Sequence, residues 1–276
     1  MTHVADRLIN RTTVRLPPHW PWAAYAALNL GLALYGLRFS EDNLDWQLWA
    51  ALPDALETGD VYRLSPLPFV WSPVAAWLMA GVSLLGYWTW VAIHVAIVFL
   101  LDRRMIALTL LSWPFWVDAA LGNTLTFAFV AAILALRGNR LAGMTYLALL
   151  LLIPRPLQAP IALWLLWKEP GLRWPFAGLF VVHGVLVVWS GQGIEWIETA
   201  LAYGRVVQSI GPPAWLGPAW FAVVLLVTPW LMARGKVGVA SLLVSPYWLP
   251  YYLMMPLIDL RNTSLDREAD VQGSGN

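Results

Sequence analysis

The longest polar stretch near the start of the chain is strongly acidic. It covers residues 40–63 and reads SEDNLDWQLWAALPDALETGDVYR. The carboxylates that precede its first base, Arg63, are Glu41, Asp42, Asp45, Asp54, Glu57 and Asp60. Apolar segments make up most of the remaining chain up to residue 260, and charged groups are costly within hydrocarbon. We therefore expect the acidic stretch beside a membrane, where a carboxylate is suited to act as a general base on a lipid-linked substrate.

Asp45 is the carboxylate that we single out within this stretch. Leucines recur every four residues, which predicts an amphipathic helix over 43–57 lying in the plane of the membrane; they are Leu44, Leu48, Leu52 and Leu56. Asp42 is suited to cap this helix, which places Asp45 in the first turn. An acid there complements the helix dipole by about 0.3–1 kcal/mol. Spacing alone favours this structural interpretation over the general-base role, since six acids compete for that role.

Arg155 is the second candidate, in the segment LLLLIPRPLQAP. Both ends of residues 140–168 are basic, so we expect a short helical hairpin or a re-entrant loop with Pro154, Arg155 and Pro156 at its tip. Broken helices at membrane depth are tolerated where they are buried in protein or line a cavity. An arginine at such a place either binds phosphate or extends to the interface as a snorkelling side chain. The sequence weighs these two alternatives equally.

Other polar groups carry weaker signals. In WPFWVDAALGNTLTF, Asp118 fits a cap of the helix expected at 120–136 better than a functional acid, while Asn123 lies where a helix N-terminus would face a substrate. His94 and His183 are isolated among apolar residues and fit hydrogen-bonded core histidines. The chain has no Cys, which excludes disulfides, thiolate metal sites and cysteine nucleophiles.

The composition predicts the class of element that must position these residues. The chain is 59% hydrophobic and 12% charged, whereas soluble domains carry roughly 25% charge. Its mean hydropathy is +0.62 and it has 19 Trp, which indicates a membrane protein with aromatic belts. A net charge of +1 without a basic stripe argues against a nucleic-acid partner.

We therefore expect an all-α, polytopic integral membrane protein with about ten membrane segments and interfacial helices in its outer loops. The clear candidates are 20–37, 67–84, 87–101, 120–136, 174–190, 216–233 and 237–258, and the shorter ones are 105–117, 141–153 and 157–167. They form one membrane domain, residues 20–260. It follows a cytoplasmic segment, 1–19, whose arginines and following apolar run fit a retained signal anchor. It precedes a disordered polar tail, 261–276.

Basic residues predict the orientation. The N-terminus and the loops RGNR, KEPGLR and ARGK are basic and are assigned to the cytoplasm. The acidic stretch and a second interfacial helix at 194–210 then lie outside. One conflict remains at residues 102–104, which fall outside if 67–84 and 87–101 both cross. Either this loop breaks the rule, or a segment within 67–117 is re-entrant.

Four segments in this order resemble the C-superfamily glycosyltransferases, specifically family 87, the polyprenol-phosphate-mannose-dependent mannosyltransferase type. They are Asp45-x3-Trp49 running to Gly59-Asp60-Val61-Tyr62; Ser65-Pro66-Leu67-Pro68-Phe69; Pro114 with Gly122-Asn123 followed by Arg155-Pro156-Leu157-Gln158; and Ser245-Pro246-Tyr247-Trp248-Leu249-Pro250-Tyr251-Tyr252. The order and rough spacing agree over about residues 20–260. Three positions depart from the family pattern: Asn123 replaces Gln, Arg155 replaces Lys and Tyr251 replaces His.

The resemblance implies transfer of a sugar, such as mannose, from a polyprenyl phosphate to a hydroxyl of a glycolipid or glycan acceptor, with inversion and without a metal or cofactor. Asp45 would be the general base. Arg155, Gln158 and Arg63 would bind the donor phosphate. The substrate cavity would include Asp42, Tyr62, Asn123, Tyr251 and Tyr252. The protein would lie in the plasma (inner) membrane with its site outside.

The departures and the short chain also fit an altered acceptor or an inactive relative. Two other classes remain open. A transporter would use the broken segment at Arg155 as its substrate site, although no convincing internal repeat is present. A non-catalytic subunit of a membrane complex would explain the short, Trp-rich chain, but it would not require the ordered motifs.

Overall fold

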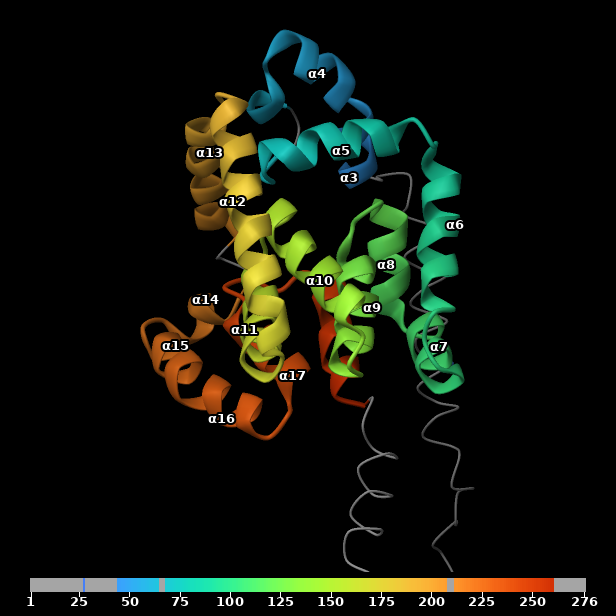
Figure 1. Cartoon of the computed structure of the whole chain (residues 1–276), viewed down its shortest axis with the longest axis vertical. Coiled ribbons are helices and arrows are strands. Elements are labelled where there is room, and N and C mark those ends of the chain that lie inside the picture. Colours follow the sequence, from blue (N-terminus) through green and yellow to red (C-terminus); the bar gives the residue numbers. More distant parts are fainter. Residues whose placement is uncertain (1–26, 28–43, 65–67, 208–210, 261–276) are drawn as a thin grey trace, which may run out of the picture.

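The structure is a computed structural model that describes residues 27, 44–64, 68–207 and 211–260. Within these residues the regular elements are all helices, so the all-α prediction is confirmed. The expected segments 1–19, 20–37 and 261–276 lie wholly or almost wholly outside the described residues, as does Asp42. Figure 1 shows helices α3, α4 and α5 as a layer across one end of a helical body.

The layer begins with α3 (Leu44–Ala50) and α4 (Leu52–Thr58). The single helix expected over 43–57 is therefore two helices. The break falls next to Pro53, whose ring removes a backbone donor and crowds the preceding turn. Asp45 lies in the first turn of α3, as expected. The short helix η2 (Val61–Arg63) then leads toward α5 (Pro73–Ser83).

Helices α5 and α6 (Tyr87–Val98) meet at 106°. They are therefore not the two antiparallel crossings expected at 67–84 and 87–101, because α5 runs across the end of the body while α6 runs along it (Figure 1). Asp102 caps α7 (Arg103–Leu110) and also forms an ion pair with Arg137. Residues 102–104 therefore lie at the same end of the helical body as the basic loop RGNR.

The core is built around α8 (Trp113–Leu121) and α9 (Leu125–Leu136). The expected segment 105–117 is divided between α7 and α8. The expected segment 120–136 begins at the end of α8 and continues as α9 after a turn at 122–124. Nine of the twelve residues of α9 are buried, and several are alanines that allow neighbouring helices to approach closely. This makes α9 the rigid support for the turn that precedes it.

The expected hairpin over 140–168 is present. It consists of α10 (Arg140–Leu152), η3 (Pro156–Gln158) and α11 (Ala159–Lys168), with Arg155 at the connection. Gln158 Oε1 accepts the backbone N–H of Arg155 at 3.1 Å, and Tyr146 Oη donates to the Gln158 carbonyl at 3.0 Å. These bonds hold the tip in one conformation, since all three groups are buried.

The second half of the chain is less regular. Its elements are η4 (Pro170–Leu172), α12 (Arg173–Trp189), α13 (Gly193–Val207), α14 (Pro212–Leu216), α15 (Ala219–Ala222), the π-helical η6 (Val223–Val227), α16 (Thr228–Ala233), α17 (Val237–Val244) and η7 (Pro250–Leu260). The span expected at 237–258 is thus interrupted between α17 and η7. Asp259 accepts the backbone N–H groups of Gly238 and Val239, which caps α17 and ties the two pieces together.

One helix among the described residues, Pro170–Trp189, is long and apolar enough to cross a membrane by itself. The bent pair of α5 and α6 passes the same test only when it is counted as one span. The apolar helices Leu125–Leu136, Arg140–Leu152 and Ala219–Ala233 are shorter. Most of the expected spans are therefore realised as short or broken helices.

Candidate functional site

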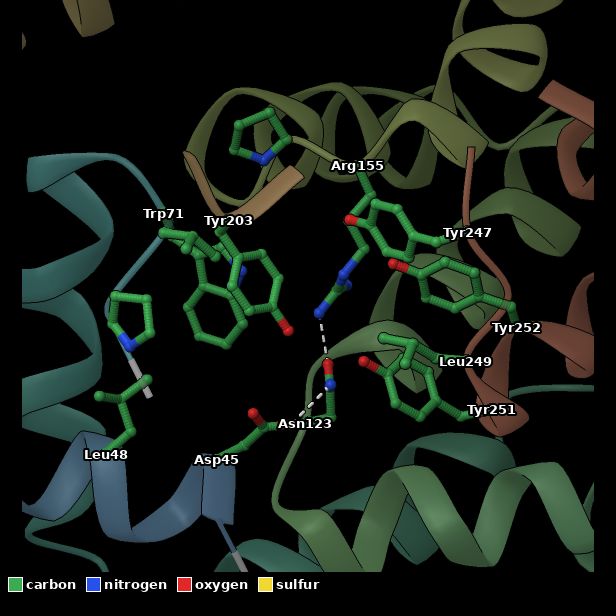
Figure 2. A pocket seen from close by; sticks show the side chains of 13 residues that line it. Asp45, Leu48, Trp71, Asn123, Arg155, Tyr203, Tyr247, Leu249, Tyr251 and Tyr252 are labelled. Atoms are coloured by element: carbon green, nitrogen blue, oxygen red, sulfur yellow. Dashed lines mark hydrogen bonds between the residues drawn. The ribbon is translucent and has the colours of Figure 1, made fainter. Parts of the chain in front are cut away.

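Residues from six separate segments of the chain line one cavity of about 60 Å³ beneath α3. Five of the predicted site residues are among them: Asp45, Asn123, Arg155, Tyr251 and Tyr252. Figure 2 shows Asp45 and Arg155 on opposite sides of Asn123. The cavity thus brings together a carboxylate, an amide, a guanidinium and several phenols.

Asn123 connects the two charged side chains. Its Nδ2 donates to Asp45 Oδ2 at 2.7 Å, and its Oδ1 accepts from Arg155 Nη2. The same Nη2 donates to Thr124 Oγ1 at 3.1 Å. Because the carboxylate only accepts and the guanidinium only donates, these partners determine the orientation of the amide.

The backbone at Gly122 makes this arrangement possible. Gly122 ends α8 with φ 79°, in the left-handed region that favours glycine. A Cβ at this position would lie 2.9 Å from the Cβ of Trp46 in α3. Trp90 Nε1 also donates to the Gly122 carbonyl at 3.0 Å. Glycine therefore lets α3 approach the turn closely enough for Asp45 to reach Asn123.

Asp118 and His94 stabilise the same turn through hydrogen bonds on its buried side. Asp118 lies inside α8 and does not open the next helix as expected, but its Oδ2 accepts the backbone N–H and the hydroxyl of Thr126, each at 2.7 Å, and so caps α9 from the neighbouring helix. His94 Nε2 lies 2.7 Å from the Asn123 carbonyl oxygen, and the ring is fully buried. His94 is thus a hydrogen-bonded core histidine, as expected. His183, by contrast, has no hydrogen-bond partner for Nε2 within the described structure.

Arg155 is buried, with 5% of its surface exposed, so it does not extend to the surface as a snorkelling side chain would. Its guanidinium carbon lies 5.6 Å from the ring centroid of Trp71. Both of its side-chain hydrogen bonds use Nη2. Within the described part of the chain, Nη1 and Nε have no acceptor, which leaves three N–H donors for an anion.

The Asp45 carboxyl has a pKa raised from 3.8 to about 6. Burial is the largest cause, because it disfavours the charged form. The nearby Arg155 charge and the hydrogen bond from Asn123 lower the pKa, while the Asp118 charge raises it. A carboxyl that titrates near neutral pH is suited to accept a proton and then release it.

Aromatic side chains form the remaining wall, and the sequence analysis did not single out several of them. These residues are Trp71, Tyr203 and Tyr247, and Leu249 lies beside them. Tyr247 and Leu249 fall inside the quoted segment 245–252, so that motif carried a signal for them. Trp71 and Tyr203 had no motif, although Tyr203 belongs to the expected outer helix at 194–210. Burial raises the pKa of the Tyr203 phenol, which keeps it a hydrogen-bond donor.

Three predicted site residues do not line the cavity. Arg63 lies at the surface and pairs with Asp60 at 3.5 Å and Glu195 at 3.4 Å. Tyr62 is buried and donates to the Trp71 carbonyl at 3.1 Å, which positions the residue that packs on Arg155. Gln158 supports the backbone of Arg155 from behind. Arg63 therefore has no contact with the cavity, whereas the other two act through Trp71 and Arg155.

Among the described residues, no three His, Asp or Glu side chains are grouped so that they could hold a metal ion. Comparison with protein family models, with curated proteins and with solved structures gives no match to this chain.

Proposed function

We propose that the protein is a membrane glycosyltransferase that moves a sugar from a polyprenyl phosphate to an extracytoplasmic hydroxyl. One observation carries the proposal: Asp45 and Arg155 line the same cavity, and the amide of Asn123 joins them. This places a base with a pKa of about 6 opposite an arginine with unused donors. Transfer of a sugar from a phosphate uses such a pair, because the base accepts the proton of the attacking hydroxyl and the cation stabilises the departing phosphate.

Exposed apolar surface supports the membrane location. Helix α12 has no buried residue, and its exposed side chains include Phe180, Val181, Val185 and Val188. Water-soluble proteins rarely expose contiguous apolar patches beyond a few hundred Å². The span Pro170–Trp189 would be about 30 Å long at the helical rise of about 1.5 Å per residue, which matches the hydrocarbon thickness.

Tryptophans at both ends of the helical body support the same location. Trp77 on α5 packs against Trp189 at the end of α12, with ring centroids 5.7 Å apart. At the opposite end of α12, Trp174 is 85% exposed. Such paired belts of Trp are typical of the two membrane interfaces.

Basic side chains accompany the second belt. Lys168 Nζ lies 4.6 Å from the ring centroid of Trp167, and the Arg234 guanidinium lies 3.9 Å from that of Trp230. This end therefore faces the cytoplasm under the positive-inside rule. The layer of α3, α4 and α5 lies at the opposite end of the body, so in this orientation the layer faces the outside (Figure 1).

The chemistry follows from the positions of the two charges. The acceptor hydroxyl would approach Asp45, which takes its proton as the oxygen attacks the anomeric carbon. The bond between that carbon and the phosphate oxygen breaks on the opposite face, so configuration inverts. The electron pair stays with the phosphate, and Arg155 stabilises the added charge through charge-assisted hydrogen bonds. Asn123 fixes the distance between the two charged groups before substrate arrives.

The cavity is too small for a sugar as it stands, since 60 Å³ holds only a few water molecules. One wall must therefore move when the donor binds. Tyr203 comes from α13, a helix whose apolar side chains Ile194, Ile197 and Leu201 are exposed. The polar contacts of α13 include a hydrogen bond from Trp196 Nε1 to the Val70 carbonyl and the exposed pair of Arg63 and Glu195, and we assign the opening motion to this helix.

Donor binding tests the proposal. The affinity of a short-chain polyprenyl phosphate can be measured by calorimetry on the full chain in detergent. Arg155→Met should weaken binding about tenfold or more, because a charge-assisted bond contributes about 1.5–3 kcal/mol. Arg155→Lys keeps the charge but loses the fork geometry, so the loss should be smaller. Arg63→Met, which removes an exposed arginine outside the cavity, is the matched control. Equal affinity in the Arg155→Met and wild-type proteins would remove the donor site.

A further inference from the structure

Tyr203 lines the cavity at Asp45, although it takes no part in the removal of the proton or the binding of the phosphate. Figure 2 shows its hydroxyl directed toward the space between Asp45 and Arg155. Among the described residues, no group forms a hydrogen bond with this hydroxyl. A phenol can both donate and accept a hydrogen bond, so both capacities of Tyr203 are available to a ligand in the cavity.

A second residue on the same face of α13 sets the position of Tyr203. Trp196 precedes it by seven residues, or about two helical turns, so the two side chains lie on one face of the helix. Trp196 Nε1 donates to the Val70 carbonyl at 3.1 Å, and Val70 also lines the cavity. The exposed Ile197 and Leu201 lie on the opposite face. The face that carries Tyr203 is therefore fixed toward the cavity.

The neighbours of Tyr203 place its hydroxyl between the two ends of the proposed reaction. Burial is the largest cause of the raised pKa of the Tyr203 phenol, and the nearby Tyr247 and Asp45 groups raise this pKa further. Tyr247 in turn interacts with Arg155. Tyr203 thus lies between the base and the surroundings of the phosphate ligand. A sugar that passes from that phosphate to an acceptor beside Asp45 must occupy this space.

We propose that Tyr203 binds the transferred sugar, with its phenol hydroxyl hydrogen-bonded to a hydroxyl of the sugar ring. This inference rests on the proposed sugar transfer, and it makes Tyr203 a determinant of which sugar is accepted. A sugar hydroxyl both donates and accepts, as the phenol does, whereas a phosphate oxygen only accepts. A site that hydrogen-bonds a substrate hydroxyl discriminates against the analogue that lacks it, because the polar group of the site is then left unpaired.

Lipid binding to the full chain in detergent tests this inference without requiring transfer. The probes are a short-chain polyprenyl phosphate and the same lipid phosphate carrying mannose, and calorimetry gives both affinities. Tyr203→Phe should weaken binding of the mannosylated lipid about three- to tenfold, the effect of one neutral hydrogen bond. Its affinity for the sugar-free lipid should equal that of the wild type. Glu198→Gln, an exposed change on the same helix outside the cavity, is the matched control and should alter neither affinity.

Monodeoxy sugars identify the hydroxyl that Tyr203 contacts. Donors that lack one ring hydroxyl of the mannose at a time are compared with the parent lipid. The wild type should bind one of these analogues about three- to tenfold more weakly than the parent. Tyr203→Phe should bind that analogue and the parent equally, and it should keep the wild-type preference against the others, because the two changes remove the same hydrogen bond. A purely structural role of Tyr203 would weaken binding of all the donors alike.

The outcomes separate this inference from the proposed function. If Tyr203→Phe loses affinity equally for the mannosylated and the sugar-free lipid, Tyr203 serves the phosphate or the fold, and the inference is overturned while the donor site at Arg155 stands. Wild-type affinity of Tyr203→Phe for the mannosylated lipid would overturn it in the same way. If the wild-type protein binds neither lipid, the proposed function itself fails, and the assignment of Tyr203 fails with it.

Discussion

Asn123 donates a hydrogen bond from Nδ2 to the Asp45 carboxylate at 2.7 Å, although 78 residues separate the two in sequence. The contact joins the layer of α3, α4 and α5 to the core, because Asp45 belongs to α3 and Asn123 to the turn before α9. The other side of the same amide accepts from Arg155. The position of Asn123 therefore sets the separation between the proposed base and the proposed phosphate ligand.

Replacing this amide by a carboxylate tests its role. Asn123→Asp keeps the shape, removes the donor to Asp45 and adds a like charge beside it. Both changes raise the pKa of Asp45, so the acid limb of the pH–rate profile should move above pH 6. An unchanged limb would show that Asn123 does not influence the base. Thr124→Val, which removes the neighbouring acceptor of Arg155 without touching Asp45, should leave the limb within a few tenths of a pH unit.

The raised pKa of Asp45 has a second consequence, for stability. Its folded-state value is about 6 against 3.8 for the ordinary group, so the folded state holds a proton that the unfolded state releases. The contribution of this group to the free energy of unfolding is fully present below about pH 4 and is lost as the pH rises through about 6. Asp45→Asn removes this loss, so the variant should gain thermal stability relative to wild type at pH 8 and not at pH 4. Equal differences in melting temperature at both pH values would contradict the shift.

The close contact at Gly122 can be tested against a matched glycine. Gly122 and Gly59 end α8 and α4 with φ 79° and 80°, so alanine carries a similar backbone cost of about 1–2 kcal/mol at each. Only at Gly122 would the new Cβ meet another residue, Trp46, whereas Gly59 has no atom within 4 Å. Gly122→Ala should therefore lower the melting temperature more than Gly59→Ala and should also reduce transfer. Equal effects would mean that α3 does not depend on this contact.

The ion pair between Asp102 and Arg137 predicts the side of the membrane on which α7 begins. The chain has no native Cys, so single cysteines report position directly. Arg104→Cys should react with an impermeant thiol reagent only after the cells are opened. Asp54→Cys, in the acidic outer layer, should react in intact cells. Labelling of Arg104→Cys in intact cells would reverse the assignment of this loop.

Much of the cavity follows from local sequence signals. Asp45 lies in a helical first turn, Arg155 lies between two prolines, and Asn123 follows a glycine, so each position is marked by its neighbours. The hairpin at 140–168 was predicted because basic residues flank two short apolar runs. Local sequence is enough to predict these positions, because each residue lies at a helix end or at a turn, where its immediate neighbours determine the backbone conformation.

Other features depend on tertiary packing and left no local signal. Nothing near Trp71 or Tyr203 indicates that both side chains line the cavity with Arg155, because Trp71, in the segment before α5, and Tyr203, on α13, reach it through tertiary packing. The bend of 106° between α5 and α6 was not predicted either, because the apolar composition of a segment does not indicate the direction of its helix relative to the next one. Arg63 was assigned to phosphate by analogy, but its nearest partners are the exposed acids Asp60 and Glu195.

The central claim is that Asp45 removes the acceptor proton during sugar transfer. The most direct measurement is the rate of transfer from a radiolabelled polyprenyl phosphate sugar by the purified protein in liposomes, compared between wild type, Asp45→Asn and Asp54→Asn. Asp54 is an exposed acid of the neighbouring helix α4 and serves as the control. The account predicts that Asp45→Asn loses about 10²–10⁴-fold in rate while it still binds the donor lipid, and that Asp54→Asn keeps its rate. Full activity in Asp45→Asn, or equal losses in both variants, would contradict it.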